Sequence, residues 1–500
     1  MSSNGKYDKY VAKMQKIADL GYSIAVLNWD QEVYLPKKST KYRAQQIATL
    51  SGLSHEFFVE EELGDILNEL SDSNTLDERQ AANIRESLKD YRLEKKYPTE
   101  FVVNMAKTTS LAATAWKDAR EKNDFKLFEK DLHSIIDLKR EETELLGYED
   151  HPYDCLLDRF EPYTTTKDIE AVFKQVKNEL VDFTLLVLDK PKVEDSFIRR
   201  KFKKDKQWDF GLELLKQMGY DFSVGRQDIS THPFTTSFNA MDVRITTRIN
   251  EHDLKEMIWS TIHEGGHALY EQGLDADEYG LPVSEAVSLG LHESQSRLWE
   301  NNVARGMPYW KANYPLLQSY FEDSMKDTSL EDFYRAINAV EASCIRTSAD
   351  ELTYHMHILI RFELEKSLIE NDLQVKDLPE AWNQKYKSYL NLDIPTDNDG
   401  VLQDIHWSGG AIGYFPTYSL GSFYAAQFYQ TAKEQIDGLE SDIEQGKLKS
   451  LLTWLRENIH QHGRIYPAKE LCKRVTGEPL NFKYFMDYVK EKFGKIYNIN

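Results

Sequence analysis

The segment His263-Glu264-Gly265-Gly266-His267 carries two imidazoles and a carboxylate at a spacing that suits metal chemistry. On an α-helix, positions i and i+4 lie on one face, so His263 and His267 could bind the same Zn²⁺ ion. Glu264 would project from the neighbouring face, near enough to hold a water molecule without binding the metal itself. The segment therefore predicts metal-assisted hydrolysis in which Glu264 acts as the general base.

The residues around this motif indicate that it lies within a helix. Asp253, followed three residues later by Glu256, predicts a capping-box start, and Gly273 predicts the end of the helix. Gly265 and Gly266 each cost the helix about 1 kcal/mol relative to alanine, so their presence needs a reason. Either the missing side chains let a substrate backbone approach the metal, or they allow another helix to pack closely.

A catalytic zinc site needs a third protein ligand and keeps a fourth position open. Glu293 lies 26 residues beyond His267, where helical sequence resumes after a loop. A carboxylate from that following helix would complete a His/His/Glu set. Glu285, His292 and Glu300 are alternative third ligands, and spacing alone does not choose among them.

The rest of the chain predicts a mainly helical body around these residues. Apolar residues recur at intervals of three and four in residues 6–36, 56–71, 75–94, 99–123, 126–146, 167–188, 310–327, 330–371 and 430–461. No repeat of about 20 to 50 residues is visible, and no long Gly/Ser/Pro linker divides the chain. We therefore expect residues 1–500 to form a single catalytic domain with two lobes around one groove.

Residues 241–249 break the helical pattern because they alternate with period two. One face would carry Val243, Ile245, Thr247 and Ile249, and the other would carry a polar row of Asp242, Arg244, Thr246 and Arg248. The pattern predicts a half-buried strand. A peptide could pair along this strand with Arg244 and Thr246 facing the cleft, or the strand could be purely structural.

Residues 400–421 form the second break, with five of the 24 glycines among several aromatic residues. A glycine-aromatic segment of this length inside a helical protein is typical of a functional loop, the alternative being a mobile connector. Tyr414 and Tyr418 in this segment are candidate oxyanion donors, and His406 could contact a substrate carboxylate or a tetrahedral oxyanion.

Composition limits the partners of the protein. With 62 Lys+Arg against 83 Asp+Glu, the net charge is −21, which disfavours nucleic acid and anionic membrane surfaces as partners. No secretory signal is visible at the N-terminus, and no apolar run approaches the ~18 residues that span a bilayer. The three cysteines lie far apart, as is typical of reduced thiols. These features together predict a cytoplasmic protein.

Five short motifs give the chain a resemblance to a known family. They are DxRxT at 242–246, HExxH at 263–267, HESQ at 292–295, IRxxAD at 345–350 and GxxQDxHW at 400–407. Together they resemble the thermostable metallocarboxypeptidases of the carboxypeptidase Taq type. The resemblance covers nearly the whole chain, and no motif position departs from the family pattern.

The resemblance implies a fold, an activity and a set of roles. It implies a mainly α, helical zincin fold (neurolysin-like) with a long deep groove and a small β-sheet lining the active site. It also implies a homodimer that removes C-terminal residues from peptides, with Zn²⁺ as the metal and Co²⁺ as a potential substitute. Glu293 would be the third metal ligand. Arg346 and the 400–407 loop, including Asp404 and His406, would hold the terminal carboxylate of the substrate.

The physical chemistry of an exopeptidase agrees with these roles. Such an enzyme must recognise a free carboxylate, and the arginine fork matches one best. Since Arg346 and Asp350 are four residues apart, they could instead form an ordinary helix ion pair. Because the whole chain is acidic, a local positive pocket of Arg346, Arg244, His406 and the metal would have to attract the substrate. The alternatives are a helical zinc oligoendopeptidase, which would tolerate a blocked C-terminus, and a binding protein with a structural zinc.

Overall fold

The computed structural model describes residues 3–499, and most of them are helical. The α-helices are α1 (Ser3–Val33), α2 (Thr40–Phe58), α3 (Glu61–Ser71), α4 (Glu78–Glu94), α5 (Thr99–Lys122), α6 (Lys126–Leu146), α7 (Pro152–Leu157), α8 (Thr166–Gln175), α9 (Val181–Leu188), α10 (Lys204–Met218), α11 (Leu254–Glu271), α12 (Leu289–Arg297), α13 (Met307–Tyr320), α14 (Glu322–Met325), α15 (Leu330–Ile337), α16 (Tyr354–Ile369), α17 (Leu378–Leu390), α18 (Pro416–Gln435), α19 (Leu439–Glu444), α20 (Lys449–Asn458), α21 (Ala468–Thr476) and α22 (Lys483–Tyr497). The strands are β1 (Gly225–Ile229), β2 (Thr235–Asn239) and β3 (Asp242–Thr247). The predicted mainly α fold with a small sheet is confirmed.

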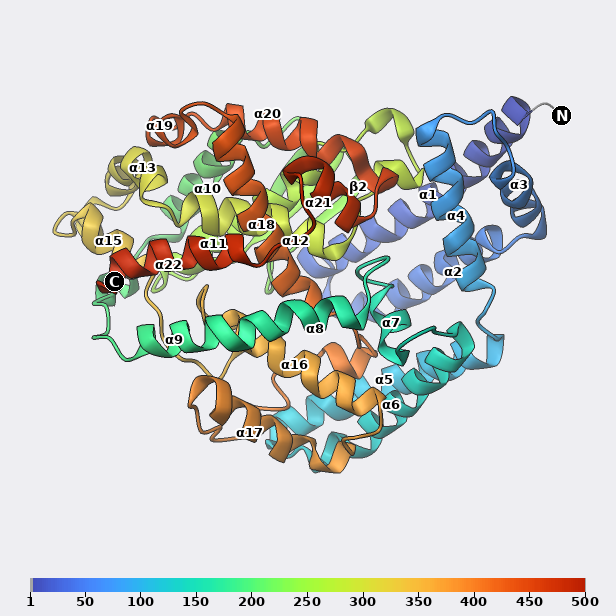
Figure 1. The fold of residues 1–500 in the computed structure, drawn as a ribbon, viewed down its shortest axis with the longest axis horizontal. Coiled ribbons are helices and arrows are strands. Elements are labelled where there is room, and N and C mark those ends of the chain that lie inside the picture. The colour runs from blue at the N-terminus through green and yellow to red at the C-terminus, as the bar shows by residue number, and fades with distance from the viewer. Residues whose placement is uncertain (1–2, 500) are drawn as a thin grey trace.

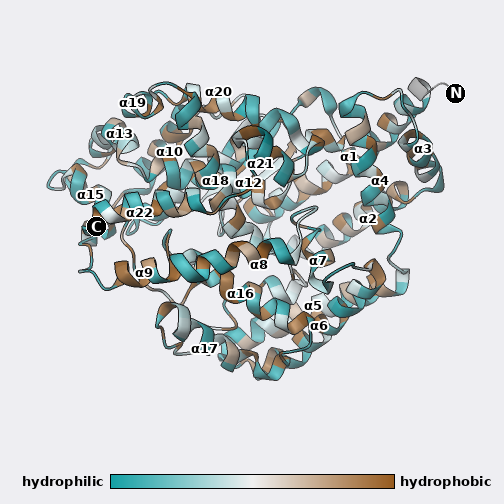
Figure 2. Cartoon of the chain, in the orientation of Figure 1, coloured by the Kyte–Doolittle hydropathy of each residue, from teal (hydrophilic) through white to brown (hydrophobic). Residues whose placement is uncertain are grey.

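The helices are arranged along one long body (Figure 1). In this view α8 and α9 cross the middle, with α16, α17, α5 and α6 on one side and α11, α12, α18 and α22 on the other. One hydrophobic core cluster contains buried residues from α5 through α22, and a smaller cluster joins α1, α3 and α4. Apolar and polar positions alternate around most helices in Figure 2, as expected for helices that bury one face. Among the described residues, no helix combines the length and apolar character needed to span a bilayer.

Four predicted helices are divided in the structure. Two of them contain a short break, 56–71 between α2 and α3 and 310–327 between α13 and α14. Residues 330–371 form α15 and α16, separated by an irregular segment with one 3-10 turn at Arg346–Ser348. Asp350 organises this segment, because its carboxylate accepts hydrogen bonds from the backbone N–H groups of Leu352 and Thr353 at 2.9 and 3.0 Å. A side chain that bonds nearby backbone in this way competes with helix formation. The alternative of a helix ion pair between Arg346 and Asp350 is therefore wrong.

Residues 430–461 are likewise not one helix, because glycines end the helical runs. α18, α19 and α20 are separated at Gly438 (φ 74°) and Gly446 (φ 72°), a left-handed conformation that glycine adopts readily. The sequence pattern does not predict α2 as a separate helix. None of its residues is buried, so this helix packs no buried face against the rest of the protein.

The three strands form one sheet in the order β1-β3-β2. β3 pairs in parallel with β1 and antiparallel with β2, and it is the strand predicted at 241–249. Both of its edges are occupied, so the idea that a peptide pairs along β3 is wrong. Thr246 does not face a cleft either, because it is fully buried and its hydroxyl lies 2.7 Å from Ser230 Oγ.

The two glycines of the HExxH segment lie where α11 packs against other helices. A Cβ on Gly266 would lie 2.7 Å from Ser296 Cα and 2.8 Å from the Gln295 carbonyl oxygen in α12. A Cβ on Gly265 would lie 2.8 Å from Leu215 Cδ2 in α10. Close helix packing therefore explains both glycines, and the suggestion that they make room for substrate is wrong.

This packing predicts that Gly266→Ala destabilises the protein. The added methyl group would meet backbone atoms of α12, which can yield only if the helix moves. We expect the free energy of unfolding to fall by about 1–3 kcal/mol, measured by denaturant titration. Gly52→Ala in α2 is the matched control, because a Cβ added there would have no neighbouring atom within 4 Å. Equal stability of the two variants would contradict close packing at Gly266.

Candidate active site

α11 places the two histidines and the glutamate on adjacent faces of one helix. Its N-terminus is capped by Asp253, whose side chain accepts a hydrogen bond from the Lys255 backbone N–H at 3.0 Å. The predicted capping box is only half right, because Glu256 pairs instead with Arg248, with 3.0 Å between Oε1 and Nε. The helix ends at Glu271, two residues before Gly273, close to the predicted end.

α12 carries Glu293 and begins at a buried cap. Ser288 accepts a hydrogen bond from the Leu291 backbone N–H, and the carboxylate of Glu161 accepts one from Gly290 at 2.9 Å. Glu161 is fully buried, and this burial raises the pKa of its carboxyl to about 7. α12 also packs closely on α18, where a Cβ on Gly421 would lie 2.5 Å from Glu293 Cγ. The cap and this packing together fix the position of the Glu293 side chain.

His263, His267 and Glu293 form a cluster with the composition of a metal site. One potential ligand atom from each residue lies within 4.8 Å of the others. Glu293 Oε2 is 3.5 Å from His263 Nε2 and 3.3 Å from His267 Nε2. Two imidazoles and one carboxylate, largely buried, are a donor set that fits a catalytic divalent metal. These three residues could hold such an ion.

The other ring nitrogens of the two histidines have partners behind the cluster. His263 Nδ1 donates to Glu300 Oε2 at 2.9 Å, and His267 Nδ1 donates to the His292 carbonyl oxygen at 3.0 Å. Such contacts orient a metal-binding imidazole and fix which nitrogen faces the metal. Two of the alternative third ligands, Glu300 and His292, thus lie behind the histidines. Glu285 lies elsewhere, 3.2 Å from Arg464.

Glu264 projects next to this cluster and is held by the sheet. Its carboxylate Oε2 lies 2.7 Å from Thr235 Oγ1 on β2, which can donate a hydrogen bond to it. The side chain is only 8% exposed, and burial raises the pKa of its carboxyl above the usual range. A buried carboxylate with a perturbed pKa beside a cluster of metal-binding groups is a candidate for proton transfer.

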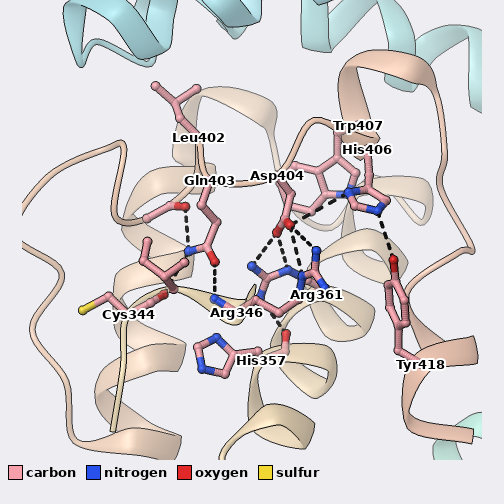
Figure 3. A network of polar contacts seen from close by, with 12 residues as sticks. Cys344, Arg346, His357, Arg361, Leu402, Gln403, Asp404, His406, Trp407 and Tyr418 are labelled. Carbon is pink, nitrogen blue, oxygen red and sulfur yellow. Dashed lines mark hydrogen bonds and ion pairs between the residues drawn. The ribbon is translucent and has the colours of Figure 1, made fainter. Parts of the chain in front are cut away.

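Arg346 and Asp404, predicted to contact substrate, are joined to each other in the structure (Figure 3). Arg346 Nε and Nη2 both donate to Asp404 Oδ1, at 3.0 and 2.8 Å. Figure 3 also shows His406 beside Asp404, with the Tyr418 hydroxyl 3.5 Å from His406 Nε2. Burial lowers the pKa of His406 to about 4, so this imidazole is neutral at neutral pH.

The two candidate tyrosines lie against the same cluster. The ring centroids of Tyr414 and Tyr418 are 5.2 Å apart, and Tyr414 lies 5.3 Å from the His406 ring. The Arg346 guanidinium carbon is 5.1 Å from the centre of the Tyr418 ring. The structure therefore brings together Arg346, Asp404 and the aromatic residues of the 400–421 segment.

Arg244, on β3, is held by one charged and two aromatic side chains. Its guanidinium forms two hydrogen bonds with Asp242, at 2.9 and 2.8 Å. It also lies between two aromatic rings, 4.4 Å from that of Trp29 and 4.8 Å from that of Phe238. These contacts tie β3 to α1 and β2.

Sequence reasoning missed the residues that connect the arginine cluster to the metal site. Arg297 Nε lies 2.7 Å from Glu293 Oε1, and its guanidinium carbon lies 4.7 Å from the centre of the Tyr354 ring. Arg346 Nη1 in turn lies 3.3 Å from the Tyr354 hydroxyl. Arg297 follows Glu293 by four residues, a spacing that predicts an ion pair on a helix. No local sequence pattern predicts the position of Tyr354.

Comparison with known proteins shows the family of the chain. The family model described as carboxypeptidase Taq (M32) metallopeptidase matches residues 9–493. Carboxypeptidase 1 of Bacillus subtilis is 39% identical over 97% of both chains. Thermostable carboxypeptidase 1 of Pyrococcus furiosus is 38% identical over 98% of this chain and 99% of its own. The crystal structure of the M32 carboxypeptidase from Deinococcus radiodurans superposes with a TM-score of 0.97 at 37% identity, covering 99% of this chain and 100% of that one.

These matches confirm the resemblance predicted from the five motifs. They also favour the carboxypeptidase function over the endopeptidase alternative, because the family and both curated relatives carry that description. A metallopeptidase family further implies a divalent metal, and the His/His/Glu cluster provides donors that fit one. The chain therefore belongs to the carboxypeptidase Taq (M32) metallopeptidase family.

Proposed function

We propose that this protein is a zinc-dependent carboxypeptidase that removes residues from the free C-terminus of peptides. His263, His267 and Glu293 would hold the metal, and Co²⁺ could replace Zn²⁺ because both accept nitrogen and oxygen donors. One observation carries this proposal. The buried Arg346 is linked to the metal cluster through Tyr354 and Arg297, so a carboxylate-binding group and a hydrolytic centre belong to one site.

The chemistry at the scissile bond rests on Glu264. When bound, the metal polarises the scissile carbonyl and lowers the pKa of a water molecule. Glu264 accepts a proton from the attacking water and delivers it to the leaving amine. Thr235 holds the Glu264 carboxylate in place for both transfers.

The other side chains position the substrate. Arg346 binds the terminal carboxylate, and His406, Tyr414 and Tyr418 contact the carboxylate or the developing oxyanion. Asp404 acts on the substrate only through Arg346, because its carboxylate oxygens accept hydrogen bonds from arginines. Arg244 would act less directly, because its guanidinium is already held by Asp242.

Several wider properties belong to the same proposal. Residues 1–500 would form one catalytic domain around a long groove, and two copies would form a homodimer, as the resemblance implies. A cytoplasmic location is supported by the three free cysteines. The net charge of −21 makes nucleic acid and anionic membranes poor partners, and the family supports peptides as the substrate class.

One experiment tests the proposed activity. A single peptide is supplied with a free or an amidated C-terminus, with and without a metal chelator, and the products are followed by mass. We expect a ladder of single C-terminal losses from the free peptide only, and no products in chelator, because Arg346 requires an anionic terminus. Cleavage at internal bonds of the amidated peptide would instead identify an endopeptidase.

A further inference from the structure

Arg361 is a fully buried arginine that shares Asp404 with Arg346 (Figure 3). It lies on α16, and its Nε donates to Asp404 Oδ2 at 2.7 Å. Its Nη1 donates to the His357 carbonyl oxygen at 2.8 Å and to the Tyr386 hydroxyl at 3.2 Å. With 0% exposure, Arg361 is not placed to touch a substrate, and the charged group it pairs with is Asp404, which also binds Arg346.

Arg346 retains the donors that a carboxylate needs. A guanidinium has five N–H donors, and Arg346 directs its Nε–H and one Nη2–H to Asp404 and one Nη1–H to Tyr354. One donor therefore remains on each terminal nitrogen. These remaining donors are available for the oxygens of a carboxylate.

A surplus of positive charge strengthens the binding of a buried anion, because opposite charges attract strongly where little water screens them. Arg346 paired only with Asp404 would be a neutral pair, and a substrate carboxylate placed beside it would meet Asp404 as a competing charge. With Arg361 included, two guanidinium charges face one carboxylate charge, leaving one positive charge in surplus. The neutral His406 adds none, in agreement with its lowered pKa of about 4.

The other buried acid near Arg361 does not cancel this surplus by pairing. Glu365 accepts hydrogen bonds from Tyr153, Trp407 and the Gly413 backbone N–H, at 2.6, 2.7 and 3.0 Å. Its donors are therefore neutral groups and not the two arginines. Burial also raises the pKa of Glu365 to about 7, which makes its charge partial at neutral pH.

We propose that Arg361 is a positioning residue that neutralises Asp404, so that Arg346 keeps a net positive charge for the terminal carboxylate of the substrate. Asp404 then holds Arg346 in place without cancelling its charge. This inference rests on the proposed function, because it assumes that Arg346 binds the carboxylate.

The test separates charge from structure by comparing two ligands. KM and kcat are measured for a peptide with a free C-terminus, and the inhibition constant Ki is measured for its amidated form. Arg361→Met should raise KM for the free peptide on the order of 100-fold, with little change in the Ki of the amide. A merely structural role would weaken both ligands together. Arg361→Gln, which keeps donors near Asp404, is a second neutral variant in case the methionine variant does not fold.

The double variant Arg361→Met/Asp404→Asn is the decisive comparison. It restores one surplus positive charge, and the asparagine oxygen can still accept from Arg346, so KM should recover most of the loss. The single variant Arg361→Lys should have a KM close to that of the unsubstituted protein, because lysine keeps the positive charge. Arg464→Met is the matched control, since it removes another largely buried arginine, here paired with Glu86 and Asp90, and should leave the ratio of KM to Ki unchanged.

The outcomes distinguish this inference from the proposed function. If folded Arg361→Met and the double variant bind the free peptide equally poorly, the charge argument is overturned. Equal losses for free and amidated peptides would also overturn it. Arg346→Met tests the underlying function, because unchanged discrimination between the two peptides in that variant would show that Arg346 does not bind the carboxylate at all.

Discussion

Replacing Glu264 with glutamine should lower kcat by about three orders of magnitude while the protein keeps its metal. Glutamine has nearly the same shape as glutamate, but its amide cannot accept a proton from water or deliver one to an amine. Because Glu264 is not a member of the ligand cluster of His263, His267 and Glu293, metal content should be unchanged. Steady-state kinetics and elemental analysis of the same preparation measure both quantities.

Thr235→Val separates the loss of the base from the loss of its orientation. This variant removes the hydroxyl that lies 2.7 Å from Glu264 Oε2 but leaves the carboxylate itself. We expect a smaller loss of kcat than for Glu264→Gln, since a neutral-to-charged hydrogen bond contributes about 1.5–3 kcal/mol. A Glu264→Gln enzyme with near-normal kcat would show that another group serves as the base.

The local part of this site could be predicted from sequence because its geometry depends on one helix. The spacing of His263 and His267 places both rings on one face of α11 whatever the rest of the fold does. The period-two pattern of β3 and the amphipathic pattern of the long helices are local in the same sense. The packing partners of Gly265 and Gly266 could not be predicted locally, because α10 and α12 contact α11 only in the folded protein.

The arginine cluster could not be predicted in detail because its contacts join distant parts of the chain. Asp404 meets Arg346 and Arg361 across 58 and 43 residues. The segment before α16 reads as helix, yet the Asp350 carboxylate bonds the backbone of Leu352 and Thr353, and Arg346 lies in a short 3-10 turn. The IRxxAD and GxxQDxHW motifs predict substrate-binding roles for Arg346 and Asp404, but they do not predict that the two side chains bind each other.

The spacing of Glu293 and Glu300 in the sequence does not show which of the two carboxylates would bind the metal. They are seven residues apart, which is about two turns, so an ideal helix would place both on the same face. The structure changes the register between them, because α12 passes into a π-helix at Leu298–Ala304. Glu293 then faces both histidine Nε2 atoms, whereas Glu300 faces His263 Nδ1 and the side chain of Arg305.

Glu293→Gln should therefore weaken metal binding far more than Glu300→Gln does. The two substitutions are matched, because each removes one negative charge from an equally buried carboxylate, 6% exposed in both cases. Loss of a partner behind a ligand costs about 10- to 100-fold in metal affinity, so Glu300→Gln should fall in that range. Glu293→Gln removes a ligand outright and should exceed it.

Competition against a chelator of known affinity measures both dissociation constants without relying on activity. Thermal denaturation of the metal-free variants provides the control, since it shows whether either substitution disturbs the fold itself. The opposite order, with Glu300→Gln losing the metal and Glu293→Gln retaining it, would make Glu300 the third ligand. In that case the pairing of Glu293 with Arg297 would be the supporting contact, and the link from Tyr354 to the metal cluster would be less direct.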